Sequence, residues 1–290
     1  MPFSPSYDVP DERRAYTMHA GPVGCLVLHG FMGSPISTRP LAAYLMEQGI
    51  TVHCPLLPGH GEYPDKFYKI PKEAWIDEVE EALAYLRTQC QEIFLIGHSM
   101  GTILGAHLVV KYGGFQGQIM LAPVYDVPDR RIRLLRAARY VMPWFYPLKS
   151  RSLRELVYER IRDFDPDIDF DDPEVQAKLP QLTRVPTSGM DEMRQMLDMG
   201  QALWPQLDLP ILVFQGELDI AASPENTQKI FDMLPSEDKE LILFKDAGHE
   251  LMRPFEPVHA EVWPKTLQFI ASHSAHRETI SLLEKPVTAD

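Results

Sequence analysis

A serine lies between two glycines in residues 97–101, which read Gly-His-Ser-Met-Gly. This segment follows an apolar run, residues 93–96, and precedes an apolar helical stretch, residues 102–112. A sharp turn from strand to helix lifts a serine hydroxyl above the edge of a sheet, and glycines two residues to either side let the backbone bend without a clash. The start of the helix also favours developing negative charge. We therefore predict that Ser99 is a nucleophile.

Serine is a weak nucleophile by itself, so a general base must lie within reach of Ser99. Among ten histidines, His249 follows the apolar run 241–244 in the segment Asp-Ala-Gly-His. Catalytic groups of open α/β sheets gather at the carboxyl ends of the strands, which favours His249 as the base. His98 adjoins the serine, but neighbouring residues on a tight turn point apart. His60, in a Pro-Gly-His-Gly turn, is a rival that we expect to be an exposed turn residue instead.

The base needs a carboxylate that fixes its tautomer and stabilises the imidazolium. Asp219 follows the predicted strand 211–214 through the segment Gln-Gly-Glu-Leu, so it also lies beyond the end of a strand. Serine, aspartate and histidine then occur along the chain in one of the known orders of such triads. We predict Asp219 as the acid, and Glu217 and Asp246 remain the alternatives.

A tetrahedral intermediate needs two N–H donors for its oxyanion, and each donor contributes about 10²–10³ to the rate. The N–H of Met100, directly after the nucleophile, is the first predicted donor. The turn at residues 29–33, which follows the first predicted parallel strand, supplies the second, and Phe31 is the expected residue.

The elements that position these residues alternate along the chain after an irregular or short antiparallel lead-in, residues 1–22. Buried strands are predicted at residues 23–28, 50–55, 93–96, 118–122, 211–214 and 240–244, and helices at residues 39–48, 75–90, 102–112, 224–234 and 259–274. This alternation indicates a parallel sheet with right-handed crossovers and with helices on both faces. The predicted fold class is α/β.

The alternation is interrupted between residues 124 and 204, where no clear buried strand appears. Helical segments are expected there at residues 130–140, 152–162 and 190–203, with an acidic stretch at residues 163–173. We predict that residues 1–123 and 205–275 form the core, that residues 124–204 form a helical cap inserted into it, and that residues 276–290 form a frayed C-terminal tail.

The segments LVLHGFMGSP, LLPGHG, GHSMG, GELD and DAGH together resemble bacterial carboxylesterases and monoacylglycerol lipases of the α/β-hydrolase superfamily. The resemblance covers nearly all of residues 23–272 and weakens in the insertion. It implies a mostly parallel eight-stranded sheet, a helical cap, and hydrolysis of short- to medium-chain carboxylic esters or monoacylglycerols. The residues that match the family's triad and oxyanion donors are Ser99, Asp219 and His249, and Phe31 and Met100. One departure is Thr102, where many relatives have glycine, and it should change helix packing only slightly.

Composition narrows the possible partners. A chain of 290 residues with 45% hydrophobic residues can bury a sizeable core, and its net charge of −13 argues against nucleic acids and anionic membrane surfaces. No stretch approaches the roughly 18 apolar residues of a membrane span, and the N-terminus has no apolar run typical of a secretory signal. The three cysteines lack metal-ligand or redox spacing. We expect a cytoplasmic protein without metal or cofactor, with a small-molecule ester as its partner. The oligomeric state is not indicated.

Two groups of residues in the cap have competing interpretations. Apolar side chains there suit a groove for an acyl chain, but we expect at least half of them to pack within the protein. They are Tyr140, Met142, Trp144, Phe145, Tyr146, Met190, Met193, Met196 and Met199. Five arginines could attract an anionic substrate, but we expect a solvated helix face paired with the acidic residues 163–172. They are Arg130, Arg131, Arg133, Arg136 and Arg139.

Three classes of function follow. Ester hydrolysis by the predicted triad is favoured. The same triad could instead serve an aminopeptidase, an acyltransferase or a carbon–carbon bond hydrolase, and the acidic residues 163–172 could hold the amino group of a peptide. Dehalogenase and epoxide-hydrolase chemistry is disfavoured, because those relatives have aspartate where this chain has Ser99. A non-catalytic binding module is the most remote class, since no triad member is missing.

Overall fold

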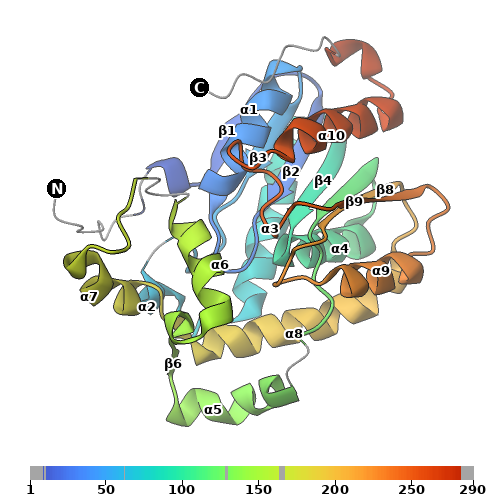
Figure 1. Cartoon of the computed structure of the whole chain (residues 1–290). Coiled ribbons are helices and arrows are strands. Elements are labelled where there is room, and N and C mark those ends of the chain that lie inside the picture. The colour runs from blue at the N-terminus through green and yellow to red at the C-terminus, as the bar shows by residue number, and fades with distance from the viewer. Residues whose placement is uncertain (1–8, 10, 62, 128–129, 163–166, 282–290) are drawn as a thin grey trace.

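The computed structural model describes residues 9, 11–61, 63–127, 130–162 and 167–281, and a seven-stranded sheet runs through it (Figure 1). Its strand order is β1-β3-β2-β4-β5-β8-β9, and only the pairing of β1 with β3 is antiparallel. The strands are β1 (Tyr16–Met18), β2 (Val23–Leu28), β3 (Thr51–Cys54), β4 (Glu92–His98), β5 (Gly117–Leu121), β8 (Ile211–Gly216) and β9 (Lys239–Phe244). Every predicted strand is therefore present, and the short antiparallel lead-in is confirmed.

The resemblance implied eight strands, and the described residues form seven. In the described part of the lead-in, the three residues of β1 pair with the sheet. Of the described residues before β1, Asp11–Arg13 form a short 3-10 helix. The side chain of Arg39 binds three carbonyls of this segment, those of Asp11, Glu12 and Arg14. These contacts hold the segment against the start of a helix, away from the edge of the sheet.

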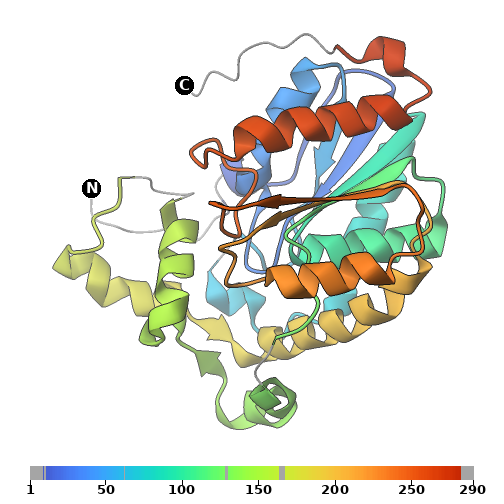
Figure 2. The ribbon, with the colours of Figure 1, turned by 45° about the vertical axis from the view of Figure 1, so that its right-hand side comes forward.

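Helices cover both faces of the sheet, as Figures 1 and 2 show. α1 (Arg39–Glu47) and α10 (His259–His273) lie on one face, and α3 (Lys72–Arg87), α4 (Met100–Tyr112) and α8 (Thr187–Leu203) lie on the other. The short α2 (Pro64–Phe67) precedes α3, and α9 (Pro224–Met233) follows β8. Every residue of β2, β4, β5 and β8 is buried, because a parallel sheet covered on both faces has no solvent-exposed side.

The chain between β5 and β8 is mostly helical. It contains α5 (Leu135–Val141), α6 (Arg151–Arg162), α7 (Pro173–Leu182) and α8, and the two-residue strands β6 (Trp144–Phe145) and β7 (Val185–Pro186) pair antiparallel. Shorter 3-10 helices are Pro35–Thr38, Arg130–Leu134, Pro147–Lys149, Trp204–Gln206 and Arg277–Thr279. α8 packs along α4, so the last part of this region lies against the core helices. The division into core and cap stays a prediction.

The sequence did not predict α7. Asp172 caps this helix, since its side chain accepts a hydrogen bond from the N–H of Glu174, and Pro173 occupies the first turn. The last residue of the acidic stretch before Pro173 therefore caps the N-terminus of α7. Proline is tolerated in a first turn because the N–H that it lacks would have no partner there.

The C-terminal residues that the structure describes are not frayed, which corrects the expectation for residues 276–281. Ile280 is buried, and the N–H of Ser281 donates to the carbonyl of Gln48 over 2.9 Å. The carbonyl of Thr279 lies 2.4 Å from the position that a Cβ on Gly49 would take, so this segment packs tightly on the end of α1. The rest of the predicted tail lies outside the described residues.

The close approach of α4 to β2 requires glycine at one position. A Cβ on Gly101 would lie 2.0 Å from the carbonyl oxygen of Leu28, far inside van der Waals contact with backbone that cannot move aside. A Cβ on Gly97, at the end of β4, would lie 2.6 Å from the backbone of Gly101. The two glycines around Ser99 thus let a helix start directly on top of two strands.

Gly101→Ala should therefore destabilise the protein by at least about 3 kcal/mol, or prevent its folding, because α4 must move away from β2. Urea unfolding followed by circular dichroism measures this change. Gly248→Ala is the matched control, because a Cβ on Gly248 meets no atom within 4 Å, and its stability should stay within about 0.5 kcal/mol. Equal losses in the two variants would contradict the packing argument.

Candidate active site

Ser99 lies on the turn between β4, which ends at His98, and α4, which begins at Met100. Its backbone has φ 54° and ψ −120°, a conformation that non-glycine residues rarely adopt. Three hydrogen bonds hold this turn. The N–H of Ser99 donates to the carbonyl of Leu121 on β5 over 2.9 Å, and the carbonyl of Ser99 accepts from both the N–H and the hydroxyl of Thr102, over 3.0 and 2.7 Å.

Thr102 was expected to change only helix packing, and the structure gives it a contact with the turn itself. Its hydroxyl is buried and donates to the carbonyl of Ser99. Glycine at this position could not make that bond. The departure from the family pattern therefore supplies one of the three bonds that hold the strained residue in place.

The structure brings His249 and Asp219 into direct contact. Nδ1 of His249 lies 2.7 Å from Oδ2 of Asp219, and both residues are buried. Asp219 follows β8, and His249 follows β9, so both come from loops at the carboxyl ends of neighbouring parallel strands. The alternative acids Glu217 and Asp246 are exposed. A carboxylate bound to Nδ1 leaves Nε2 of the imidazole for proton transfer.

Hydrogen bonds keep the Asp219 carboxyl ionised. Burial alone would raise its pKa, but the hydrogen bond and charge attraction of His249, together with the N–H groups of Ala222 and Ala221, outweigh burial and lower the pKa. Oδ1 accepts from both N–H groups, over 2.8 and 2.7 Å. A permanently ionised partner is what a histidine needs to become an imidazolium during a reaction.

Gln215 is a site residue that the sequence reasoning missed. Its Nε2 donates to Oδ2 of Asp219 over 3.2 Å, and its Oε1 accepts from the hydroxyl of Thr227 over 2.7 Å. Gln215 is fully buried in β8, an otherwise apolar strand. That signal was available, because a polar residue inside a buried strand needs hydrogen-bond partners.

The predicted hydrogen bond between His249 and Ser99 is not formed. Nε2 of His249 is buried and has no hydrogen-bond partner among the described residues, which include Ser99. Ser99 itself is 6% exposed. Hydrogen bonds of catalytic groups are often long without a substrate and tighten when one binds.

The two predicted oxyanion donors lie beside Ser99. A Cβ on Gly30 would lie 3.0 Å from Cβ of Ser99, so the turn after β2 touches Ser99. Within this turn Met32 has a φ of 60°, and the N–H of Gly33 donates to the carbonyl of Gly30 over 3.0 Å. Met100 is the first residue of α4, where an N–H has no partner within the helix. No hydrogen bond of the described residues uses the N–H of Phe31 or Met100.

An aromatic cluster supports the turn that carries Phe31. The Phe31 ring packs at 5.3 Å from Phe67 and 6.2 Å from Trp75 and from His60, measured between ring centroids. His60 lies 4.7 Å from Phe67 and is only 2% exposed. The expectation that His60 is an exposed turn residue was therefore wrong. Phe67 of α2 and Trp75 of α3 pack against its ring, so the imidazole is buried among aromatic side chains.

α8 also packs against this aromatic cluster, at Phe67. A Cβ on Gly189, in the first turns of α8, would lie 2.1 Å from Cε1 of Phe67. The helix backbone therefore lies directly against the Phe67 ring, which in turn contacts Phe31.

The tautomer of buried His29 follows from its two partners. Nε2 accepts from the N–H of Leu57 over 3.2 Å, so Nδ1 carries the proton and donates to the carbonyl of Gly30 over 3.0 Å. Burial lowers the pKa of His29 to about 4, although the Gly30 carbonyl acts in the opposite direction. A neutral His29 thus joins the turn at Gly30 to the loop that contains Leu57.

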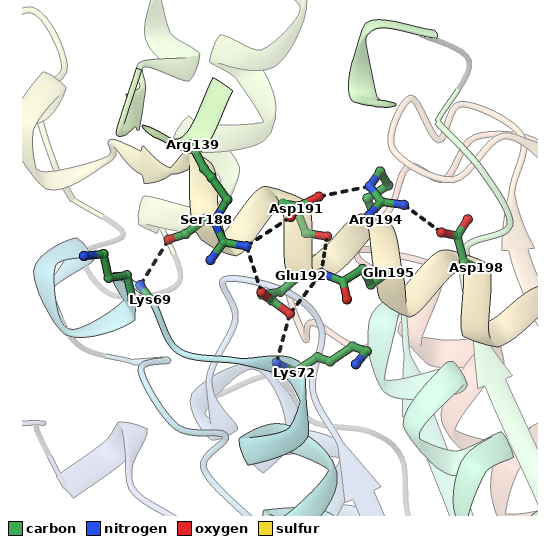
Figure 3. A network of polar contacts seen from close by, with 9 residues as sticks. All are labelled: Lys69, Lys72, Arg139, Ser188, Asp191, Glu192, Arg194, Gln195 and Asp198. Carbon is green, nitrogen blue, oxygen red and sulfur yellow. Dashed lines mark hydrogen bonds and ion pairs between the residues drawn. The ribbon is translucent and has the colours of Figure 1, made fainter. Parts of the chain in front are cut away.

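The arginine-rich helix of the insertion does not pair as expected. Arg139 on α5 binds Asp191 and Glu192 on α8, with Nη1 3.0 Å from Oδ2 of Asp191 and 3.2 Å from Oε1 of Glu192 (Figure 3). Arg194 also binds Asp191, over 3.0 Å. The predicted partner segment contributes Asp172 to the cap of α7 instead. Arg133 and Arg136 are exposed; the side chains of Arg130 and Arg131, and residues 163–166, lie outside the described residues.

The Arg139 network also reaches the core. The backbone N–H of Lys72, at the start of α3, donates to Oε2 of Glu192 over 3.3 Å, and that of Lys69 donates to the hydroxyl of Ser188 over 3.0 Å (Figure 3). Glu192 therefore joins α5, α8 and the segment before α3. Both carboxylates are nearly buried and have partners, so neither is set up to hold the amino group of a substrate.

The apolar residues of the insertion divide between packing and exposure. Met196 is fully buried, and Met193 and Met199 pack against the core, which confirms the structural interpretation for these three. Tyr140 and Met142 are 84% and 58% exposed. The remaining residues of the group, Trp144, Phe145, Tyr146 and Met190, are half-buried.

Residues 23–257 match the family described as serine aminopeptidase, S33. A thermostable monoacylglycerol lipase of Bacillus sp. (strain H-257) is 26% identical over 275 residues, which cover 93% of this chain and 99% of that protein. A carboxylesterase of Bacillus subtilis (strain 168) is 24% identical over 259 residues, which cover 86% of this chain and 94% of that protein.

Solved structures show the same fold. A metagenome-derived lipolytic enzyme from work on LipS and LipT superposes with a TM-score of 0.76 at 22% identity, covering 92% of this chain and 100% of that one. A monoacylglycerol lipase of Paleococcus ferrophilus gives a TM-score of 0.69 at 20% identity, covering 90% and 98%. The chain has the α/β-hydrolase fold. Within the described residues no helix has the length and apolar character to cross a membrane, and the expected cytoplasmic location stays a prediction.

His29 should make the stability of the protein depend on pH between about 6.5 and 4. Above pH 6.5 the imidazole is neutral in both states, and below it the unfolded chain binds a proton that the folded site excludes until about pH 4. The free energy of unfolding should therefore fall by up to about 3 kcal/mol over this range. His29→Gln should be less stable at pH 7 but lose about 3 kcal/mol less on acidification, as urea unfolding at several pH values would measure. Equal losses in both proteins would disprove this role.

Arg139→Met should lower the free energy of unfolding by about 2 kcal/mol, because two nearly buried carboxylates lose a partner. Adding Glu192→Gln should cost less than the two single changes predict, with a coupling energy of about 1 kcal/mol in a double-mutant cycle measured by urea unfolding. Arg136→Met, on the exposed side of the same helix, is the control and should stay within about 0.5 kcal/mol. Additive effects would show that Arg139 and Glu192 do not interact in solution.

Proposed function

Because this chain belongs to the serine aminopeptidase S33 family and has the α/β-hydrolase fold of lipases and esterases, we propose that it hydrolyses carboxylic esters of short- to medium-chain acyl groups, monoacylglycerols among them. Two relatives that match most of its length are named as a monoacylglycerol lipase and a carboxylesterase. The observation that carries the proposal is the 2.7 Å contact between His249 Nδ1 and Asp219 Oδ2, in loops beside the turn of Ser99.

Acylation begins with a proton transfer from the Ser99 hydroxyl to Nε2 of His249. The serine oxygen then bonds to the ester carbonyl carbon, and the carbonyl oxygen takes the negative charge. The N–H groups of Phe31 and Met100 stabilise that oxyanion, with the N-terminus of α4 adding its dipole. His249 next donates its proton to the leaving alcohol, and an acyl-serine remains.

Deacylation repeats these steps with water. His249 takes a proton from the water molecule, whose oxygen attacks the acyl carbon, and the proton then returns to the Ser99 oxygen as the carboxylic acid leaves. Asp219 stays ionised throughout, since its lowered pKa keeps it from accepting the proton of the imidazolium. It stabilises the positive charge of His249 in both half-reactions.

The helices between β5 and β8 would then act as a cap that binds the acyl chain. Half-buried residues of this region, such as Trp144 and Met190, provide apolar surface of the kind that acyl chains contact. Residues 124–204 are the proposed cap, and residues 1–123 and 205–275 the proposed core. α8 is the exception inside this division, since it packs along α4.

Aminopeptidase activity is the second candidate, because the family carries that description. Such an enzyme needs an acidic side chain for the substrate amino group. Among the described residues of the insertion, the nearly buried carboxylates are Asp191 and Glu192, and arginines already hold them. The ester-hydrolase proposal needs no such group and is favoured for that reason. Aminoacyl p-nitroanilides tested beside the esters separate the two reactions.

Wild-type protein should hydrolyse p-nitrophenyl esters with an optimum between acetate and decanoate, and Ser99→Ala should reduce kcat by at least about 10⁴-fold. A spectrophotometric assay over the series from acetate to palmitate measures both effects. Circular dichroism and urea unfolding of Ser99→Ala check that the variant is folded. A fluorophosphonate probe reports separately whether Ser99 is reactive.

Turnover of esters in Ser99→Ala at the wild-type rate would exclude Ser99 as the nucleophile. A probe-reactive wild-type protein that hydrolyses no ester would instead point to a peptidase, an acyltransferase or a carbon–carbon bond hydrolase with the same triad. A folded protein that does not react with the probe would leave a non-catalytic binding module.

A further inference from the structure

Three buried polar side chains lie behind His249 and have no part in the mechanism above. His98, Glu250 and Arg253 are 5%, 8% and 2% exposed. They line one small cavity together with the turn at residues 30–34. Burying an imidazole, a carboxylate and a guanidinium is costly unless they hold one another, so their arrangement calls for a reason.

His98 reaches the backbone of His249. Its Nε2 lies 3.0 Å from the carbonyl oxygen of His249, and because a carbonyl can only accept, Nε2 carries the proton and donates it. The two imidazole rings lie 4.8 Å apart between centroids. The Nδ1 edge of His98 faces Gly30, where a Cβ would lie 3.4 Å away. The ring of His98 thus lies between the turn at residues 29–33 and the loop that carries His249.

His98 is well suited to hold another residue, because its own backbone is paired within the sheet. It is the last residue of β4, paired with Leu121 of β5, in the middle of the sheet. His249, in contrast, lies in a loop of 14 residues between Phe244, where β9 ends, and His259, where α10 begins. A long loop needs anchors of this kind to keep a side chain in a fixed position.

Glu250 and Arg253 belong to this loop and pair with each other beside His98. Oε1 of Glu250 lies 3.2 Å from Nη2 of Arg253, and Oε2 lies 4.0 Å from Nε2 of His98. Neighbouring hydrogen bonds anchor the loop further along: the N–H of Leu218 donates to the carbonyl of Ala247, and Nε1 of Trp263 to that of Met252. The bond from His98, in contrast, acts on the backbone of His249 itself.

We propose that His98 is a positioning residue for this reaction: its Nε2–H bond to the carbonyl of His249 fixes the backbone of that residue, while Asp219 fixes its ring. The proposal rests on the proposed ester hydrolysis. A histidine held only at Nδ1 can still swing about that bond. With its backbone also held, Nε2 has one position relative to Ser99, and displacements of about 1 Å are known to cost about 100-fold in rate.

Two substitutions at His98 separate the hydrogen bond from packing. His98→Leu fills a similar volume without a donor, whereas the side-chain amide of His98→Gln can place an N–H near the position of Nε2. We expect kcat for p-nitrophenyl butyrate to fall about 10- to 100-fold in His98→Leu, with KM within about twofold of the wild-type value. His98→Gln should recover most of that loss.

A spectroscopic readout follows His249 directly. The proton between His249 Nδ1 and Asp219 should give a low-field resonance in the proton NMR spectrum of the wild-type protein. We expect that resonance to be retained in His98→Gln and to broaden or shift in His98→Leu, because the ring is no longer held in one orientation. A role in packing alone would lower the unfolding midpoint of both variants without this difference.

The rate of labelling by a fluorophosphonate probe separates this proposal from the proposed function. If wild-type protein hydrolyses no ester but its Ser99 reacts with the probe, the proposed function fails, and slower labelling in His98→Leu than in His98→Gln would still support positioning. Wild-type kcat in folded His98→Leu, or equal losses in the two variants, would overturn the proposal. If His98→Leu does not fold, His98→Asn replaces it, since its shorter amide cannot reach the carbonyl of His249.

Discussion

The backbone of Ser99 adopts a left-handed conformation that costs a non-glycine residue about 1–3 kcal/mol, and the packing of α4 on the sheet maintains it. Gly101 touches the carbonyl of Leu28 so closely that the helix has one place to start. That start sets the height of the serine hydroxyl above the strands, and it points the N–H of Met100 and the dipole of α4 to the same spot. Gly30 then brings the neighbouring turn against the serine. The rest of the site is arranged around this one packing constraint.

Around this constraint, buried polar groups have charge states that follow from their partners. Asp219 accepts bonds from one imidazole, one amide and two backbone N–H groups, and it therefore stays ionised. His29 has one acceptor and one donor as neighbours, and it therefore stays neutral. Local geometry thus determines where protons are, and it leaves Nε2 of His249 without a hydrogen-bond partner among the described residues.

The sequence predicted those parts of the fold that depend on local patterns. β2 and the start of α9 were placed to the residue, because apolar runs and a serine followed by proline mark them clearly. It failed where the partner of a residue is set by tertiary packing. Nothing near Arg139 indicates that its partners lie 52 and 53 residues away on another helix. His60 was misjudged for the same reason, since its loop has turn residues that usually lie at the surface. The contact of Asp219 with His249 could be anticipated, because both follow neighbouring strands of a parallel sheet.

The absence of a side chain at Gly189 has a mechanical consequence. At this position the backbone of α8 contacts the Phe67 ring directly, because no side chain lies between them. Phe67 in turn packs against the ring of Phe31. A shift of the first turns of α8 toward the sheet would require the Phe67 ring to move as well. The packing at Gly189 thus links the position of α8 to that of Phe31, whose N–H is one of the two proposed oxyanion donors.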